Sequence, residues 1–182
     1  MSFLRGLAAR IKSHDDNDCK RSVKQIASEF SILGPEIGDA AGIGVAKINV
    51  GLFSRKVVEL VKATDTAVSL DATQYQLCMA IRNTKDEKLK TICWRIRLQI
   101  ILSFHEFSKL IEAVKSDPSP ETRKKLVEWM EYSSDLSKHA INALNPDSTA
   151  RGVKPEHSLD EITNYQKITE GDLQAALTSL LH

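Results

Sequence analysis

The sequence has almost no excess of charge of either sign, and it has few aromatic residues. Its 25 basic and 24 acidic residues leave a net charge of +1, which gives no global reason to expect a nucleic acid or an anionic membrane as partner. Aromatic residues make up 5% of the chain, so the core must come mainly from leucine, isoleucine, valine and alanine. With 182 residues, the chain is long enough for one globular domain with an appended tail.

Cysteine is also scarce. Cys19, Cys78 and Cys93 are odd in number and show no Cys-x-x-Cys spacing, which predicts reduced thiols rather than a disulfide framework or a zinc site. Residues 1–16 lack an uninterrupted apolar segment followed by a small-residue cleavage site, so we expect no secretory signal. Both features predict a cytoplasmic protein.

No long uncharged apolar run is present either. The most apolar stretch, residues 32–53, contains Glu36, Asp39 and Lys47, and therefore falls short of the roughly 18 uncharged residues that indicate a membrane span. We expect no constitutive transmembrane helix.

Gly34, Gly38 and Gly42 in that stretch are spaced by four residues. This spacing places them on one helical face, where small residues let a neighbouring backbone approach closely. We predict a helix-packing role. In the alternative, an N-terminal amphipathic helix and this segment rearrange and insert into a membrane, which costs ~2.5–3.5 kcal/mol for an aspartate such as Asp39.

Signatures of catalysis and of metal binding are missing. The sequence has no His-Glu-x-x-His, Glu-x-x-His, Gly-x-Ser-x-Gly, Walker or Gly-x-Gly-x-x-Gly motif. Asp135 and His139 share a helical face, but two ligands do not make a metal site, and we favour a solvated ion pair. His105 and Glu106 diverge by about 100° on a helix and cannot act together directly. We therefore predict no enzyme, no catalytic residue, no metal and no cofactor.

Helical periodicity runs through the chain and no strand pattern is visible, so we predict an all-α, up-and-down-like bundle of five to six helices with an appended C-terminal helix. The expected helices cover residues 2–12, 19–34, 35–63, a segment capped by Ser69 or Asp71 that ends before residue 83, residues 86–115, and residues 120–144. The bundle is assigned to residues 1–145, and residues 146–182 form a linker and a C-terminal amphipathic helix.

The helix at 86–115 carries apolar residues on two sides, which indicates that other helices surround it. We expect Ile96 and Ile100 to be buried. The sequence Asp117-Pro-Ser-Pro-Glu121 predicts the end of this helix and a capped start of the next. That next helix repeats apolar residues at helical spacing, and we expect them to face the core. They are Leu126, Trp129, Met130, Leu136, Ile141 and Leu144.

The tail ends in a short amphipathic helix. Ser158 with Glu161 forms a capping box, and Thr169 with Asp172 resembles a second one. The apolar positions of the last helix, which include an LxxLL pattern, are Leu173, Leu177, Leu180 and Leu181. We expect them to dock on the chain's own bundle; a second copy of the chain or a groove on another protein is the alternative.

Basic residues cluster at two places, Lys20–Lys24 and Lys85–Arg97. Acids interleave in the second cluster and no aromatic platform accompanies either, so we interpret both as solvated helix surfaces rather than as a nucleic-acid site.

Two stretches resemble known helical modules. AGIGVAKINVGLFSRKVVELV (residues 41–61) is similar to the opening helix of HeLo-type domains, the membrane-active modules of fungal cell-death systems. SLDATQYQLCMAIRN (69–83), the long helix after it and KKLVEWMEY (124–132) resemble helical N-terminal modules of NLR-like immune proteins. The resemblance implies a helical bundle that oligomerises or recruits partners in immune or cell-death signalling.

We therefore expect a non-enzymatic interaction module that binds protein partners, a second copy of the chain among them. A membrane-perturbing cell-death effector of HeLo type, membrane-associated on activation, is the alternative. A helical enzyme without a recognisable motif comes third.

Overall fold

The protein folds as an all-α bundle, as the sequence predicts. The computed structural model describes Leu4, Gly6 and residues 58–117, 119–146 and 153–181, and within these ranges it contains helices and no strand. The helices are α4 (Val58–Asn83), α5 (Glu87–Ser116), α6 (Pro120–Leu144), α7 (Leu159–Tyr165) and α8 (Glu170–Leu181). Apart from Leu4 and Gly6, which are helical, the residues before Val58 lie outside the described residues, and with them the glycine row Gly34, Gly38 and Gly42.

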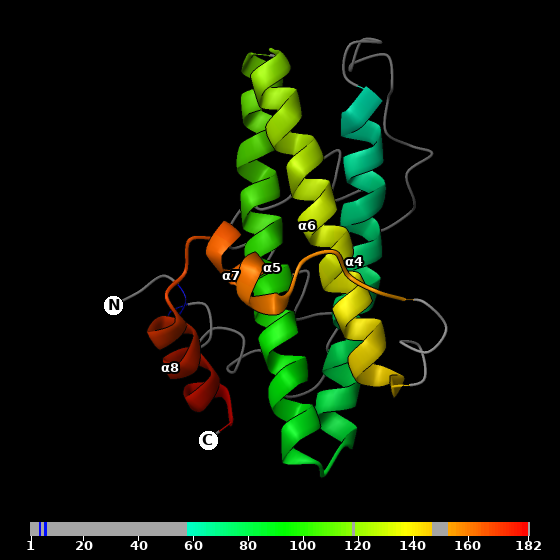
Figure 1. The fold of residues 1–182 in the computed structure, drawn as a ribbon, viewed down its shortest axis with the longest axis vertical. Helices are drawn as coiled ribbons and strands as arrows, with labels where there is room; N and C mark the ends of the chain where they lie inside the picture. The colour runs from blue at the N-terminus through cyan, green and yellow to red at the C-terminus, as the bar shows by residue number, and fades with distance from the viewer. Residues whose placement is uncertain (1–3, 5, 7–57, 118, 147–152, 182) are drawn as a thin grey trace.

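Three long helices build the bundle. α4, α5 and α6 run alternately up and down, and each packs against the other two (Figure 1). The short α7 lies across the middle of α5 and α6, and α8 packs beside the lower half of α5. No helix in the described part of the chain is both long enough and apolar enough to cross a membrane.

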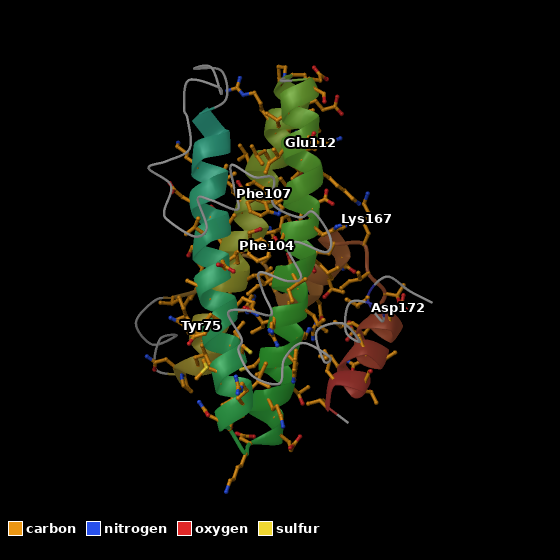
Figure 2. The ribbon with its side chains drawn as sticks, turned by 180° about the vertical axis from the view of Figure 1, so that it is seen from behind. Tyr75, Phe104, Phe107, Glu112, Lys167 and Asp172 are labelled. Atoms are coloured by element: carbon orange, nitrogen blue, oxygen red, sulfur yellow. The ribbon has the colours of Figure 1, made fainter. Side chains whose placement is uncertain are left out.

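α5 packs against α4, α6 and α8, so several helices surround it, as its two apolar sides predict. Its first turn is capped by Asp86, whose carboxylate accepts from the amides of Lys88 and Leu89. Ile96 and Ile100 are fully buried, which confirms the expected core. Phe104 and Phe107 point from α5 into the bundle (Figure 2).

The contact of α5 with α6 includes an aromatic stack. The rings of Phe107 and Trp129 lie 4.3 Å apart and nearly parallel, and the Trp129 indole N–H donates to the carbonyl of Ser103 at 2.8 Å. The Ser103 and Ser133 hydroxyls are 2.6 Å apart in the same buried layer. The indole and both hydroxyls thus have hydrogen-bond partners inside the core, which removes the cost of burying them unpaired.

α6 begins where the Pro-Ser-Pro sequence predicts. The Ser119 hydroxyl accepts from the amide of Thr122, and Pro120 is the first helical residue. One expected core position is wrong: Ile141 is 43% exposed. The buried face of α6 runs through Leu126, Trp129, Ser133, Leu136 and Ala140, so Ile141 lies about 100° away from it.

α4 corrects a predicted boundary. The sequence suggested one helix ending near residue 63 and another capped by Ser69 or Asp71, whereas α4 is continuous from Val58 to Asn83. No glycine or proline interrupts this range, and the Thr66 and Thr73 hydroxyls bond back to carbonyls four residues earlier, Lys62 and Ser69, instead of capping.

The inner face of α4 contains an uncompensated polar group. Its buried side chains include those of Leu70, Gln74, Leu77, Cys78 and Ile81. Gln74 is fully buried, however, and among the residues that the structure describes neither its side-chain oxygen nor its nitrogen has a hydrogen-bond partner. Such a group destabilises a core.

Arg95 and Arg97 correct the interpretation of the second basic cluster as a solvated surface. Arg97 is fully buried and its guanidinium lies 4.8 Å from the centre of the Trp94 ring. The Arg95 side chain is 17% exposed and pairs with Asp160 on α7. Lys85 and Lys88 are exposed as expected.

The cysteines differ from the expectation of three reduced thiols. Cys93 is free and fully buried, and burial raises the pKa of its thiol to about 11. Cys78 is disulfide-bonded, so the prediction is wrong for this residue. Sequence spacing could not reveal the bond, because disulfide pairing depends on three-dimensional proximity.

Candidate functional site

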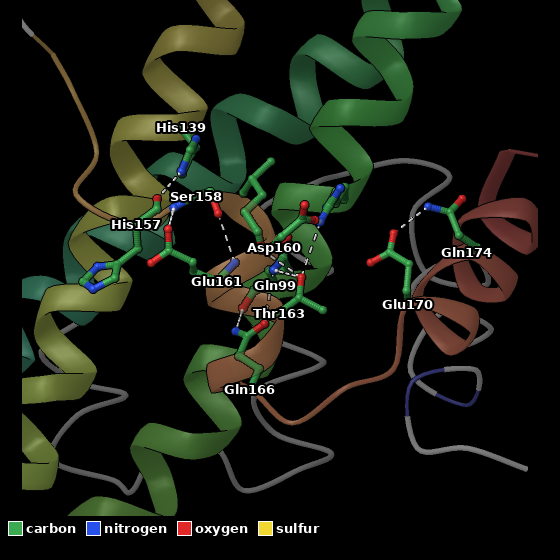
Figure 3. Close-up of polar contacts among 12 residues, drawn as sticks. Gln99, His139, His157, Ser158, Asp160, Glu161, Thr163, Gln166, Glu170 and Gln174 are labelled. Carbon is green, nitrogen blue, oxygen red and sulfur yellow. Dashed lines mark hydrogen bonds and ion pairs between the residues drawn. The ribbon is translucent and has the colours of Figure 1, made fainter.

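The segment from Val153 to Ser158, called the strap below, is held along α6. The amide nitrogen of Asn142 donates to the carbonyl of Val153 at 3.0 Å, and the Nε2 of His139 lies 2.8 Å from the carbonyl of His157 (Figure 3). These two contacts, from successive turns of α6, fix the course of the chain before α7 begins.

Asp135 is the central anchor of the strap. Its carboxylate accepts from the backbone amides of Glu156 and His157, both at 3.0 Å, and lies 2.7 Å from the His157 Nδ1. The residue is only 2% exposed. Asp135 is therefore a buried acceptor for the strap and not half of a solvated ion pair with His139, as the sequence suggested; both residues instead bind the strap.

α7 is fastened to α5 by side chains that interrupt an otherwise apolar face. The buried Gln99 amide donates to the Thr163 hydroxyl at 3.1 Å, and the Gln166 amide donates to the Gln99 carbonyl at 2.7 Å (Figure 3). Arg95 pairs with Asp160 at 2.9 Å. The start of α7 is set by the predicted Ser158–Glu161 capping box, which is present with both of its hydrogen bonds.

A three-ring stack joins strap, α6 and α7. The Tyr132 ring lies between His157, at 4.2 Å, and Tyr165, at 4.0 Å with only 3° between the two tyrosine planes. Because these rings come from three separate segments, the stack fixes α7 relative to α6.

α5, α6 and α7 together enclose a groove of about 1070 Å³. It is lined by apolar side chains that are mostly buried, by two tyrosines and by charges of both signs. The main lining residues are Leu102, Leu110, Trp129, Leu136, Ile162 and Ile168, then Tyr132 and Tyr165, and then Glu106, Lys109, Lys125, Glu128, Glu161 and Lys167.

The charged residues are arranged unevenly along the groove. Three carboxylates, those of Glu106, Glu128 and Glu161, accompany Tyr132 and Tyr165; we call these five residues the tyrosine end. Lys109 and Lys125 lie one helical turn beyond Glu106 and Glu128, both toward the junction of α5 and α6, and we call them the lysine end.

Both phenols at the tyrosine end are held in the protonated form. Burial raises the pKa of Tyr165 well above its usual range, and the charges of Glu106 and Glu128 add to this effect. Burial, and then the charges of Glu128 and Glu161, raise the pKa of Tyr132 as well. The tyrosine hydroxyls therefore act as neutral hydrogen-bond donors and acceptors.

His105 also lines the groove. Burial and the neighbouring Lys109 lower the pKa of its imidazole, against a smaller opposing effect of Glu106. The imidazole is accordingly neutral at pH 7. Although His105 and Glu106 diverge on α5, the groove brings both to one surface.

The predicted docking residues of the tail lie on α8. Leu173, Leu177 and Leu180 of α8 are buried in the same hydrophobic cluster as Leu4 and α5, and Leu181 packs partly buried against it. The Thr169 hydroxyl accepts from the amide of Asp172 at 3.1 Å, at the predicted start of α8. The leucines of the LxxLL pattern therefore pack against the chain's own bundle.

The sequence did not predict the groove. Its α6 wall carries Lys125, Glu128, Trp129, Tyr132 and Leu136, which recur at three- and four-residue spacing. This spacing gives one helical face, but the mixture of charge and aromatic rings hides it from a search for apolar stripes. The α7 wall comes from a segment that the sequence suggested only as a short turn.

No family model matches this chain, and neither a curated protein nor a solved structure matches it.

Proposed function

We propose that this chain is a non-enzymatic helical interaction module that binds a segment of a partner protein in the groove between α5, α6 and α7. The observation that carries the proposal is the lining of the groove: buried apolar side chains flanked by three carboxylates and three ammonium groups. Such a mixture complements a polypeptide, whereas a nucleic acid requires a concentrated basic surface. A role in immune or cell-death signalling, implied by the resemblance to NLR-like modules, is part of this proposal.

The length of the groove suits a short helical or extended segment. Its wall covers Leu102 to Leu110 on α5, about 12 Å at 1.5 Å per residue, and Lys125 to Leu136 on α6, about 16 Å. This corresponds to two or three turns of a bound helix, which would present apolar side chains at three- and four-residue spacing.

The walls are fixed before a ligand arrives. Two walls are long helices of the core, and the third, α7, is held by the Gln99 contacts and the tyrosine stack. A groove with fixed walls loses little conformational entropy on binding, which favours affinity.

The two tyrosines of the groove are poorly suited to act as a nucleophile or a general base. A nucleophile or general base needs a lowered or well-matched pKa, whereas the pKa values of Tyr132 and Tyr165 are raised. These phenols are suited to hydrogen bonding.

The proposal is tested by panning a displayed library of random 16-residue peptides on the full chain and measuring the affinity of the selected peptides by fluorescence anisotropy. Lys125→Trp places a large side chain in the groove, and Lys124→Trp is the matched control. Both lysines are exposed neighbours on α6, and only Lys125 lines the groove. We expect Lys125→Trp to weaken binding about tenfold or more, the loss typical of a blocked interface centre, and Lys124→Trp to leave it unchanged.

Peptides that bind both variants equally well would show that the groove is not the binding surface. The membrane-perturbing alternative predicts a different result, dye leakage from anionic liposomes. If the protein causes leakage at concentrations at which no groove-dependent peptide binding is seen, the membrane effector is favoured over the interaction module.

A further inference from the structure

The tyrosine end carries an excess of negative charge next to aromatic rings. Glu106 on α5, Glu128 on α6 and Glu161 on α7 approach it from three helices, close enough for their charges to act on the two phenols. The stacking of Tyr132 and Tyr165 at 4.0 Å holds both rings in place between these carboxylates.

We propose that the tyrosine end is a subsite for a basic side chain, an arginine or lysine, of the partner segment. The subsite rests on the proposed function, because it assigns the chemistry of the segment that the groove binds. Carboxylates bind a guanidinium or ammonium ion through charge-assisted hydrogen bonds. The neutral hydroxyls of Tyr132 and Tyr165 add acceptors for its N–H groups.

The other charged and titratable residues around the groove are compatible with a cation at the tyrosine end. Lys167 is exposed at the margin, and three carboxylates outnumber its single ammonium group at this end. His105 is neutral and does not oppose a cation. Lys109 and Lys125 lie one turn away, so a partner carboxylate about one helical turn from the basic residue would meet them.

The three tyrosines of the chain allow a direct experiment. The full chain is labelled with ¹³C-tyrosine, which gives signals for Tyr75, Tyr132 and Tyr165 only. Tyr75 is exposed on α4, on the opposite side of the bundle from Lys167, and serves as an internal control (Figure 2). N-acetyl-arginine amide is titrated into the protein, with the uncharged isostere N-acetyl-citrulline amide as the matched probe.

We expect arginine amide to shift the signals of Tyr132 and Tyr165 saturably, with Tyr75 unchanged, and citrulline amide to produce no saturable shift. The double variant E106Q/E128Q removes two carboxylates without changing side-chain shape, and should weaken arginine binding about fivefold or more. E87Q/E112Q removes two exposed carboxylates of α5 that lie outside the groove lining, and should change binding less than about twofold.

Equal binding of the arginine and citrulline probes, or an equal effect of the two double variants, would overturn the subsite. A separate result would refute the proposed function: selected peptides that bind Lys125→Trp and Lys124→Trp equally well. If selected peptides require the groove but tolerate E106Q/E128Q, the interaction module stands and the basic-residue subsite is wrong.

Discussion

Replacing Gln74 by methionine should stabilise this protein. Gln74 is fully buried on the inner face of α4, and both polar atoms of its side chain lack a hydrogen-bond partner in the described part of the chain. Folding thus removes the amide from water without returning a hydrogen bond. Methionine has a similar length and nearly the same helix propensity, and it adapts to an irregular space.

The expected gain can be worked out from the two terms involved. Leaving a buried amide unpaired costs about 1–3 kcal/mol, and refilling the space with a side chain of slightly different shape costs about 1 kcal/mol. The difference between the two terms is a rise of up to about 2 kcal/mol in the free energy of unfolding. For a chain of this length, 1 kcal/mol shifts the melting temperature by about 2–4 °C, so we expect an increase of up to about 8 °C.

The assay is thermal and urea unfolding of the full chain, followed by circular dichroism. Gln76→Met is the matched control, because Gln76 is on the same helix and exposed, and its replacement should change stability by less than about 0.5 kcal/mol. A melting temperature that falls for Gln74→Met, with Gln76→Met unchanged, would show that the Gln74 amide is paired in solution. The reasoning from an unpaired buried amide would then be refuted.

Three further results are expected. Asp135→Asn should destabilise the protein by about 1–3 kcal/mol in urea unfolding, because the charged acceptor of the strap is lost; stability equal to that of the parent chain would mean that the strap contacts contribute nothing. Cys93, fully buried with its thiol pKa raised to about 11, should resist iodoacetamide in the folded protein at pH 8 and react after unfolding, and rapid labelling of native Cys93 would contradict its burial. Deleting residues 169–182 should expose the apolar surface beneath Leu173, Leu177 and Leu180, lower solubility and increase binding of a hydrophobic dye, whereas an equally soluble and stable truncated chain would mean that α8 adds nothing to the bundle.

The elements that the sequence predicted correctly are those set by local chemistry. The start of α5 at Asp86, the Ser119-Pro120 start of α6 and the Ser158–Glu161 capping box depend on residues within one turn of each other. The buried positions Ile96 and Ile100 follow from a periodicity that holds wherever the helix packs. The break expected within α4 was wrong, because Ser69 and Asp71 can cap a helix but are also tolerated inside one.

The sequence by itself determined that this protein is helical, where α5 and α6 begin, and that the leucines of α8 need an apolar partner. Only the tertiary structure decided what those faces contact: that Asp135 holds the strap instead of pairing with His139, that Arg95 and Gln99 fasten α7, and that Tyr132 meets Tyr165. Capping and periodicity act over a few residues, so a sequence displays them directly. The groove instead combines side chains up to 66 positions apart, from Leu102 to Ile168, and such contacts are decided by packing energies summed over the whole bundle.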